Sequence, residues 1–169
     1  EIKNGLKTNH WIWYIFPQLR CLGHSSRAHY YGIADRDEAQ RYLEHPILGA
    51  RIREITEVLL EHKDKTALSI FGDIDAIKVR SCMTMFDFLS PNDIFGEVLD
   101  SFYKSERCKL TLRVMQHGWK EVTELKVQYL GKKGPVSELT NYMRELSPEE
   151  KREFGMMLND LNELAKEGI

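Results

Sequence analysis

Cysteine is scarce in this chain of 169 residues, and long apolar runs are missing. The three cysteines, Cys21, Cys82 and Cys108, form an odd set at wide spacing, so we expect free thiols, no disulfide and no metal site. The longest apolar run, residues 11–16, is far too short to span a bilayer, and no charged-then-apolar leader opens the chain. We therefore expect a cytoplasmic protein with no membrane partner.

An excess of charge of either sign is also missing. The chain has 24 Lys and Arg against 26 Asp and Glu, a net charge of -2. A large nucleic-acid surface usually shows as a positive excess, so the composition argues against an extended polynucleotide site and leaves only a local basic patch open. Hydrophobic residues at 42% and charged residues at 30% are typical of a globular protein and exclude a disordered or fibrous one.

Two-residue alternation between hairpin turns is absent, whereas helical periodicity and cap signals recur along the chain. We predict an all-α fold, a compact multi-helix domain followed by a helical hairpin. Asp35 with Glu38, and Ser90 before Pro91, predict two helix starts. The clearest helix has one apolar stripe, formed by Leu48, Ile52, Ile55 and Leu59.

The domain boundary is expected at the pair His117-Gly118, giving domains 1–118 and 119–169. Before it, a helix with a buried side of Cys82, Met83 and Phe86 is expected to begin at a cap, Asp73 or Asp75. After it, the turn at residues 131–135 breaks the helical pattern, and Ser147-Pro148 predicts the start of a last helix.

Residues 10–18 are the most informative stretch, because two tryptophans, two further aromatics and several polar side chains lie within nine residues. Aromatic side chains remove large areas from water, and a buried indole N–H usually needs a partner. This combination suits a lined pocket, and equally a core that fixes one packing.

Several motifs occur in a characteristic order over residues 1–115. They include His10-Trp11-x-Trp13-x-Ile15-Phe16-Pro17-Gln18, His45-Pro46, Ile70-Phe71-Gly72 and Lys78-x-Arg80-Ser81-x-Met83-Thr84-x-Phe86. With these motifs the chain resembles a family of small bacterial proteins, domain-of-unknown-function family 1810. Family members usually carry an extra helix before this stretch, so the resemblance implies that the first helix of the domain is missing from this sequence.

A second set of motifs covers residues 122–165. It includes Leu125-x-Val127-x-Tyr129-Leu130-Gly131-Lys132-Lys133-Gly134-Pro135 and Leu146-Ser147-Pro148-Glu149-Glu150. This segment resembles the N-terminal helical hairpin of the bacterial phenylalanyl-tRNA synthetase alpha subunit, an arm that contacts transfer RNA. The resemblance implies that this hairpin is either a weak tRNA-contacting arm or a stabilising element. The charges of Lys132 and Lys133 could contact RNA phosphates, although two lysines in a turn more often only keep it solvated. The class-defining catalytic motifs do not occur in the sequence, so we expect no aminoacylation. A natural chain joining these two pieces would be odd, so we favour an engineered fusion over a natural join.

The polar and aromatic side chains of the best-matched motifs are the candidate ligand-binding residues. Lys78 and Arg80 could hold a phosphate or carboxylate together, the two tryptophans could stack on a planar base, and His10 or Gln18 could hydrogen-bond its edge. The same residues could equally serve the core. The full set is His10, Trp11, Trp13, Gln18, Lys78, Arg80, Ser81 and Thr84.

A fainter likeness rests on the order of residues 78–86, then Phe95 and Val98-Leu99. It is to small, largely helical N-glycosidases that act on ADP-ribose-type or riboflavin-pathway nucleotides. Such chemistry needs a carboxylate near the sugar cation. Asp75 and Asp87 are the nearest, but a helix cap and an exposed helix position explain them better, so no catalytic residue is assigned. Two hypotheses remain: a domain that binds a nucleotide-like small molecule, with or without hydrolysis, and a non-enzymatic structural module. Neither implies a cofactor, and the oligomeric state stays open.

Overall fold

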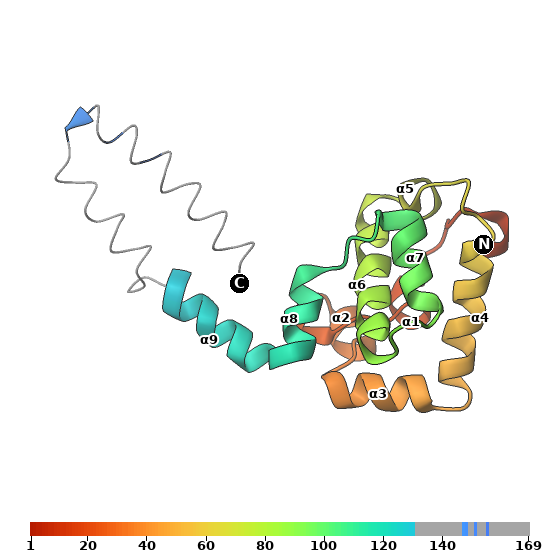
Figure 1. Cartoon of the computed structure of the whole chain (residues 1–169), viewed down its shortest axis with the longest axis horizontal. Coiled ribbons are helices and arrows are strands. Elements are labelled where there is room, and N and C mark those ends of the chain that lie inside the picture. The colour runs from red at the N-terminus through yellow and green to blue at the C-terminus, as the bar shows by residue number, and fades with distance from the viewer. Residues whose placement is uncertain (131–146, 149–150, 152–154, 156–169) are drawn as a thin grey trace. The chain divides into compact units, whose positions relative to one another are not determined.

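The computed structural model describes residues 1–130, 147–148, 151 and 155. Within this part every regular element is helical, which confirms the predicted all-α class (Figure 1). The elements are η1 (Ile2–Asn4), α1 (Ile12–Ile15), η2 (Arg20–Leu22), α2 (Ser26–Tyr31), α3 (Arg36–Glu44), α4 (Leu48–Leu60), α5 (Ala67–Phe71), α6 (Asp73–Leu89), α7 (Ile94–Tyr103), α8 (Lys109–His117) and α9 (Trp119–Leu130). None of these helices is long and apolar enough to cross a bilayer.

The chain divides into two compact units, Glu1–Gln116 and His117–Ile169. In the second unit, α9 follows Gly118, which has a φ of 80°. Further on, the backbone N–H of Lys151 donates to the Ser147 carbonyl at 2.9 Å, as expected where a helix begins. The predicted turn at residues 131–135 lies outside the described residues.

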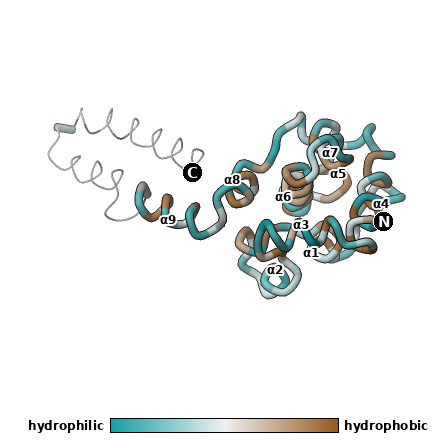
Figure 2. The backbone as a smooth tube through the Cα atoms, turned by 60° about the horizontal axis from the view of Figure 1, so that its bottom comes forward, coloured by the Kyte–Doolittle hydropathy of each residue, from teal (hydrophilic) through white to brown (hydrophobic). Residues whose placement is uncertain are grey.

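Helix α6 is the centre of the first unit. Residues 81–86 of α6 are all buried, as expected of a helical segment that is packed on every face, whereas Ile74 and Ile77 in its first turns are exposed. Figure 1 shows α6 among the other helices of this unit, and α7, α5, α3 and α1 all contact it. Figure 2 shows hydrophobic residues concentrated along α6 and α7, whereas α3 is mainly hydrophilic. The expected buried residues Cys82, Met83 and Phe86 are confirmed.

An aromatic stack ties three helices together. The ring of Phe86 in α6 lies 5.6 Å from Tyr42 in α3 and 5.3 Å from Phe95 in α7. Each such pair adds about 0.5–1.5 kcal/mol to the area that it buries. The stack therefore fixes the mutual placement of α3, α6 and α7.

The first residues of α7 and α6 differ from the two predicted N-caps. Asp93 rather than Ser90 is the N-cap of α7, because its carboxylate accepts the Ile94 N–H at 2.8 Å, while Ser90 closes α6. The N-cap of α6 is Gly72, with a φ of 77° and no side-chain cap, so neither Asp73 nor Asp75 caps this helix. Both acidic residues lie in the first turn of α6, where their negative charges interact favourably with the helix dipole and stabilise the helix.

The apolar stripe of α4 is rotated slightly from the prediction. Ile52 and Leu59 are almost fully buried, whereas Leu48 is 37% exposed. Gly49 takes the core-facing position of the first turn, since a Cβ there would lie 2.0 Å from the Leu43 carbonyl oxygen. The glycine thus lets the start of α4 approach the end of α3.

Residues 10–18 divide between core and surface. Phe16 is fully buried and meets Phe71 edge-on at 5.9 Å, whereas Tyr14 is 52% exposed. Beyond them, the Ile33 N–H donates to the Gln18 carbonyl at 3.0 Å, and the Arg20 N–H donates to the Ile33 carbonyl at 2.7 Å. These two bonds hold Gln18 in place beside α6.

Candidate functional site

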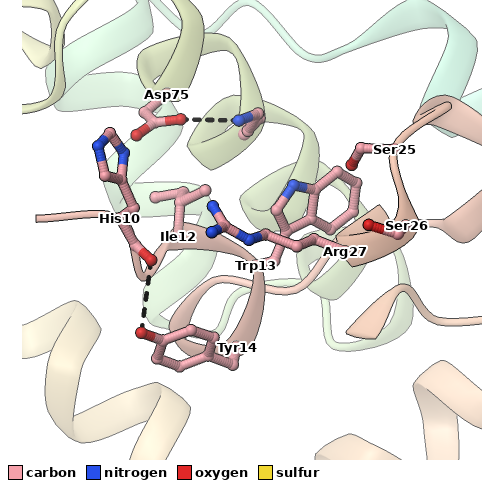
Figure 3. A pocket seen from close by; sticks show the side chains of 9 residues that line it. His10, Ile12, Trp13, Tyr14, Ser25, Ser26, Arg27 and Asp75 are labelled. Carbon is pink, nitrogen blue, oxygen red and sulfur yellow. Dashed lines mark hydrogen bonds and ion pairs between the residues drawn. The ribbon is translucent and has the colours of Figure 1, made fainter. Parts of the chain in front are cut away.

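The candidate site is a cavity of about 410 Å³ between α1, α2 and the first turns of α6, here named the Lys78 cavity (Figure 3). Side chains from three separate stretches of sequence meet there. They are His10, Ile12, Trp13 and Tyr14, then Ser25, Ser26 and Arg27, then Asp75 and Lys78.

An ion-pair network forms one wall of the Lys78 cavity. The Asp75 carboxylate lies 2.6 Å from Lys7 Nζ and 2.8 Å from Lys78 Nζ. Partial burial raises the pKa of Asp75, but the hydrogen bonds and charges of the two lysines outweigh it, so its pKa lies below the ordinary value. Asp75 is therefore ionised at neutral pH, and it is shared between two cations.

Trp13 forms a second wall. Its side chain is only 8% exposed, and Lys78 Nζ lies 5.8 Å from the ring centroid, within cation–π range. Gly23 packs against the ring, because a Cβ there would meet the Trp13 ring carbon Cη2 at 2.8 Å. The prediction that Trp13 offers a stacking face is therefore unsupported by its burial, and the indole acts as a wall that positions Lys78.

A second cavity of about 450 Å³ lies next to the first, and we name it the Gln18 cavity. The two share Trp13, Ser25 and Lys78. The Gln18 side chain is 6% exposed and forms no hydrogen bond with the described residues. The remaining lining is mainly apolar and consists of Leu22, Gly23, His24, Ile74, Ile77, Ser81, Cys108 and Leu110.

The loop that carries His10 is held by the carboxylate of Glu1. This group accepts the Thr8 N–H at 2.8 Å and the indole N–H of Trp11 at 2.8 Å, and it also accepts from Asn9. The Thr8 hydrogen bond is the largest influence that lowers the pKa of Glu1, to about 2. Trp11 is thus engaged by Glu1 and lines neither of the two cavities.

Three of the candidate residues on α6 do not line the Lys78 cavity. Arg80 Nη1 lies 3.5 Å from Glu106, and Thr84 donates to the Arg80 carbonyl and accepts the Cys108 N–H. Ser81 borders the Gln18 cavity but is bonded to Thr111 at 2.8 Å. Residues two apart on a helix do not face each other, and Arg80 lines neither cavity, so the structure does not bring Lys78 and Arg80 together at one cavity.

No group of three or more His, Cys, Asp and Glu side chains suited to a metal occurs in the part of the chain that the structure describes. Asp87 differs from the expected exposed position: its side chain is 14% exposed and pairs with Arg107 Nε at 2.9 Å. It lines neither cavity. The RNA-contact candidates Lys132 and Lys133 lie outside the described residues.

The sequence analysis missed Arg27, Ser25 and Ser26 as lining residues of the Lys78 cavity. Ser25 is the N-cap of α2 and accepts the Ala28 N–H at 3.2 Å, so the local signal was that of a cap. Their place beside Lys78 depends on how α2 packs, which sequence periodicity does not report.

Comparison with known proteins gives one family for residues 1–115. The family model described as Protein of unknown function (DUF1810) matches residues 1–115. The crystal structure of the conserved hypothetical protein Rv1873 from Mycobacterium tuberculosis is 36% identical, with a TM-score of 0.66, and the match covers 68% of this chain and 83% of that one. The first unit thus has the same helical fold as that protein, and the chain belongs to the DUF1810 family.

The C-terminal segment matches a different family. The model for the aminoacyl tRNA synthetase class II N-terminal domain covers residues 119–169. The phenylalanine--tRNA ligase alpha subunits of Halalkalibacterium halodurans and Bacillus pumilus are 48% identical over 50 and 44 residues. These matches cover 30% and 26% of this chain, and only 14% and 13% of the ligase subunits. Both resemblances inferred from the motifs are confirmed.

Proposed function

We propose that the first unit binds a small phosphate-bearing molecule of the nucleotide class, such as ADP-ribose, in the Lys78 cavity. The observation that carries this proposal is the surplus of positive charge. Lys78 and Arg27 line the cavity against a single lining carboxylate, Asp75, whose charge is also matched by Lys7. A phosphate would complete this charge balance through charge-assisted hydrogen bonds.

Neutral donors surround the two cations. The hydroxyls of Ser25 and Ser26 and the ring of His10 line the same space, and the exposed ring of Tyr14 stands at its edge. Cavities that hold small molecules usually combine apolar walls with a few convergent polar groups. The lining of the Lys78 cavity has this composition.

The Gln18 cavity supports a ligand with a planar part. Its walls are largely apolar, and the buried Gln18 amide supplies a donor and an acceptor that the described residues leave unused. Because the two cavities share Trp13 and Lys78, one molecule could place its phosphate in the first and its base in the second.

Hydrolysis of an N-glycosidic bond is not part of this proposal. A general acid must be protonated at the working pH, whereas the lowered pKa of Asp75 keeps it ionised. Its negative charge is also engaged by Lys7 and Lys78 and so is a weak candidate for stabilising a sugar cation. We therefore propose binding alone.

The test is a thermal-shift titration of the whole chain with ADP-ribose, using Lys78→Met and, as a matched control, Arg80→Gln. Both variants remove one positive charge from α6, but Arg80 lines neither cavity. At a ligand concentration of 100 times Kd, we expect stabilisation by about 2.7 kcal/mol in the wild type and in Arg80→Gln, and none in Lys78→Met. Equal shifts in all three proteins would refute the Lys78 cavity as the site.

The competing hypothesis is a structural module. It predicts that ADP-ribose and related nucleotides leave the melting temperature unchanged, while His10→Ala and Gln18→Ala lower it without any effect of ligand. Under that outcome the polar residues of the motifs would serve packing alone.

For residues 119–169 we propose weak contact with transfer RNA, on the strength of the identity to ligase alpha subunits. Phosphate contacts weaken steeply with salt, so the whole chain should retain tRNA at low salt and lose it at about 0.2 M salt. Replacing Lys132 and Lys133 by alanine should reduce this retention. No retention at low salt would end the proposal.

A further inference from the structure

Three exposed tyrosines run outward from the edge of the Lys78 cavity. Tyr14 lines the cavity, its ring lies 5.4 Å from that of Tyr31, and Tyr31 in turn lies 4.9 Å from Tyr30. Their exposed fractions are 52%, 42% and 80%. We call these residues the tyrosine strip. An aromatic cluster this exposed is unusual for a surface with no binding role.

The segment that carries the tyrosine strip is free of acidic residues. None of the 26 Asp and Glu of the chain falls within residues 2–34, which contain Lys3, Lys7, Arg20 and Arg27 and three histidines. The same segment forms η1, α1, η2 and α2, and so supplies most of the lining of the Lys78 cavity. A locally positive surface therefore exists in a chain whose net charge is -2.

Two of the carboxylates near this surface are already engaged, whereas a third, Glu54 of α4, lines an adjoining pocket with Tyr14, Lys3 and Arg51. Asp75 of α6 is paired with Lys7 and Lys78, and Glu1 accepts hydrogen bonds from Thr8, Asn9 and Trp11. Arg27 keeps an exposed side chain beside the cavity. A phosphate chain crossing this face would meet cations whose charge exceeds that of the opposing carboxylates.

We propose that the ligand of the Lys78 cavity belongs to a single-stranded nucleic acid, with one nucleotide in the cavity and its neighbours stacked on the tyrosine strip. This inference rests on the proposed function. Tyr30 and Tyr31 line neither cavity, so a mononucleotide would leave them unused, whereas adjoining bases would cover them. A duplex would hide its base faces, and stacking on tyrosine needs those faces free.

Stacking on aromatic residues tolerates any base, so the tyrosine strip would accept any base. An acidic protein segment could also meet tyrosines and cations. The surplus of positive charge from Lys78 and Arg27 favours a phosphate-bearing strand. The adjoining cavity also contains the Gln18 amide, which forms no hydrogen bond with the described residues and could bind a base.

The experiment measures fluorescence anisotropy of a labelled single strand of about ten nucleotides, which exceeds the smallest site sizes of single-strand binders. It uses the whole chain and the variants Tyr30→Ala, Tyr30→Ala with Tyr31→Ala, Lys78→Met, and Lys132→Ala with Lys133→Ala. The last variant controls for binding by residues 119–169. Urea unfolding of each variant checks that Tyr31→Ala leaves the first unit folded, and ADP-ribose binding is measured in parallel.

We expect the strand to bind about tenfold or more tighter than ADP-ribose, in line with the stacking of one or more bases. The double tyrosine variant should lose that advantage while keeping its affinity for ADP-ribose, and Lys78→Met should weaken both ligands. The corresponding duplex should bind weakly.

Equal affinity for strand and ADP-ribose, or unchanged strand binding by the double tyrosine variant, would overturn the inference and leave the proposed function intact. If neither ligand binds, both fail. Binding of polyglutamate that depends on Tyr30 and Tyr31, with no strand binding, would assign the surface to an acidic protein partner and would equally overturn the inference.

Discussion

Asp75→Asn should lower stability without lowering ligand affinity. The carboxylate holds Lys7, whose side chain is only 6% exposed, and Lys78, which is 25% exposed. Removing one partner of a buried ion pair costs about 3–5 kcal/mol. Because Asp75 and Lys78 are partly exposed, water screens part of this interaction, and we expect a loss of about 2 kcal/mol.

The assay is urea unfolding followed by tryptophan fluorescence, with Asp73→Asn as the control. Asp73 lies in the same first turn of α6 but is exposed, so its substitution changes the helix dipole term alone. For a unit of 116 residues, a loss of about 2 kcal/mol corresponds to a fall in melting temperature of roughly 8 °C. Asp73→Asn should cost less than about 1 kcal/mol.

The pH dependence has a definite sign. The pKa of Asp75 is lowered in the folded state, so its contribution is full above the unfolded pKa of about 3.9 and disappears as the pH falls through the folded pKa. The difference between wild type and Asp75→Asn should therefore be constant near pH 7 and shrink below about pH 4.

The effect of Asp75→Asn on ligand affinity is expected to be opposite to its effect on stability. Asp75 competes with a phosphate for Lys78, so Asp75→Asn should bind ADP-ribose as tightly as the wild type or up to about tenfold more tightly. If Asp75→Asn is as stable as Asp73→Asn, the network does not hold Lys7. If the affinity falls with the stability, Asp75 supports the ligand directly and the charge argument is refuted.

Three further predictions concern the core. Gly49→Ala should lose about 2 kcal/mol or more in urea unfolding, since its Cβ would meet the Leu43 carbonyl; an unchanged midpoint would contradict that contact. Ser81→Ala and Thr111→Val should each cost about 1–3 kcal/mol, and the double variant less than their sum, because each single change leaves a buried hydroxyl unpaired; a double-mutant cycle with additive costs would refute the coupling. Cys82 is fully buried with a raised pKa, so a thiol reagent at pH 8 should modify it only in urea; rapid labelling of native Cys82, read by mass spectrometry, would show that the core opens.

Much of the fold was readable from the sequence because its signals are local. The all-α class follows from apolar periodicity, and the buried side of α6 follows from the spacing of Cys82, Met83 and Phe86. Helix starts were less predictable: Asp93 rather than Ser90 caps α7, since both can accept a backbone N–H and only the packed geometry selects one.

The site was predictable only in part. His10, Trp13, Gln18, Lys78 and Ser81 border the two cavities, whereas Arg80 and Thr84 lie off them because of the rotation of successive residues around a helix. Arg27 carried no sequence signal at all, since an exposed arginine in a short helix is common.

Local sequence patterns account for the helices, for the two family matches at residues 1–115 and 119–169, and for the concentration of aromatic and basic residues near the start of the chain. Which of these side chains meet depends on how the helices pack in three dimensions. Helical periodicity records which face of a segment is apolar, but the neighbours of that face come from distant parts of the chain. The pairing of Lys78 with Asp75 and Lys7, and the burial of Trp13 against Gly23, are contacts of this long-range kind.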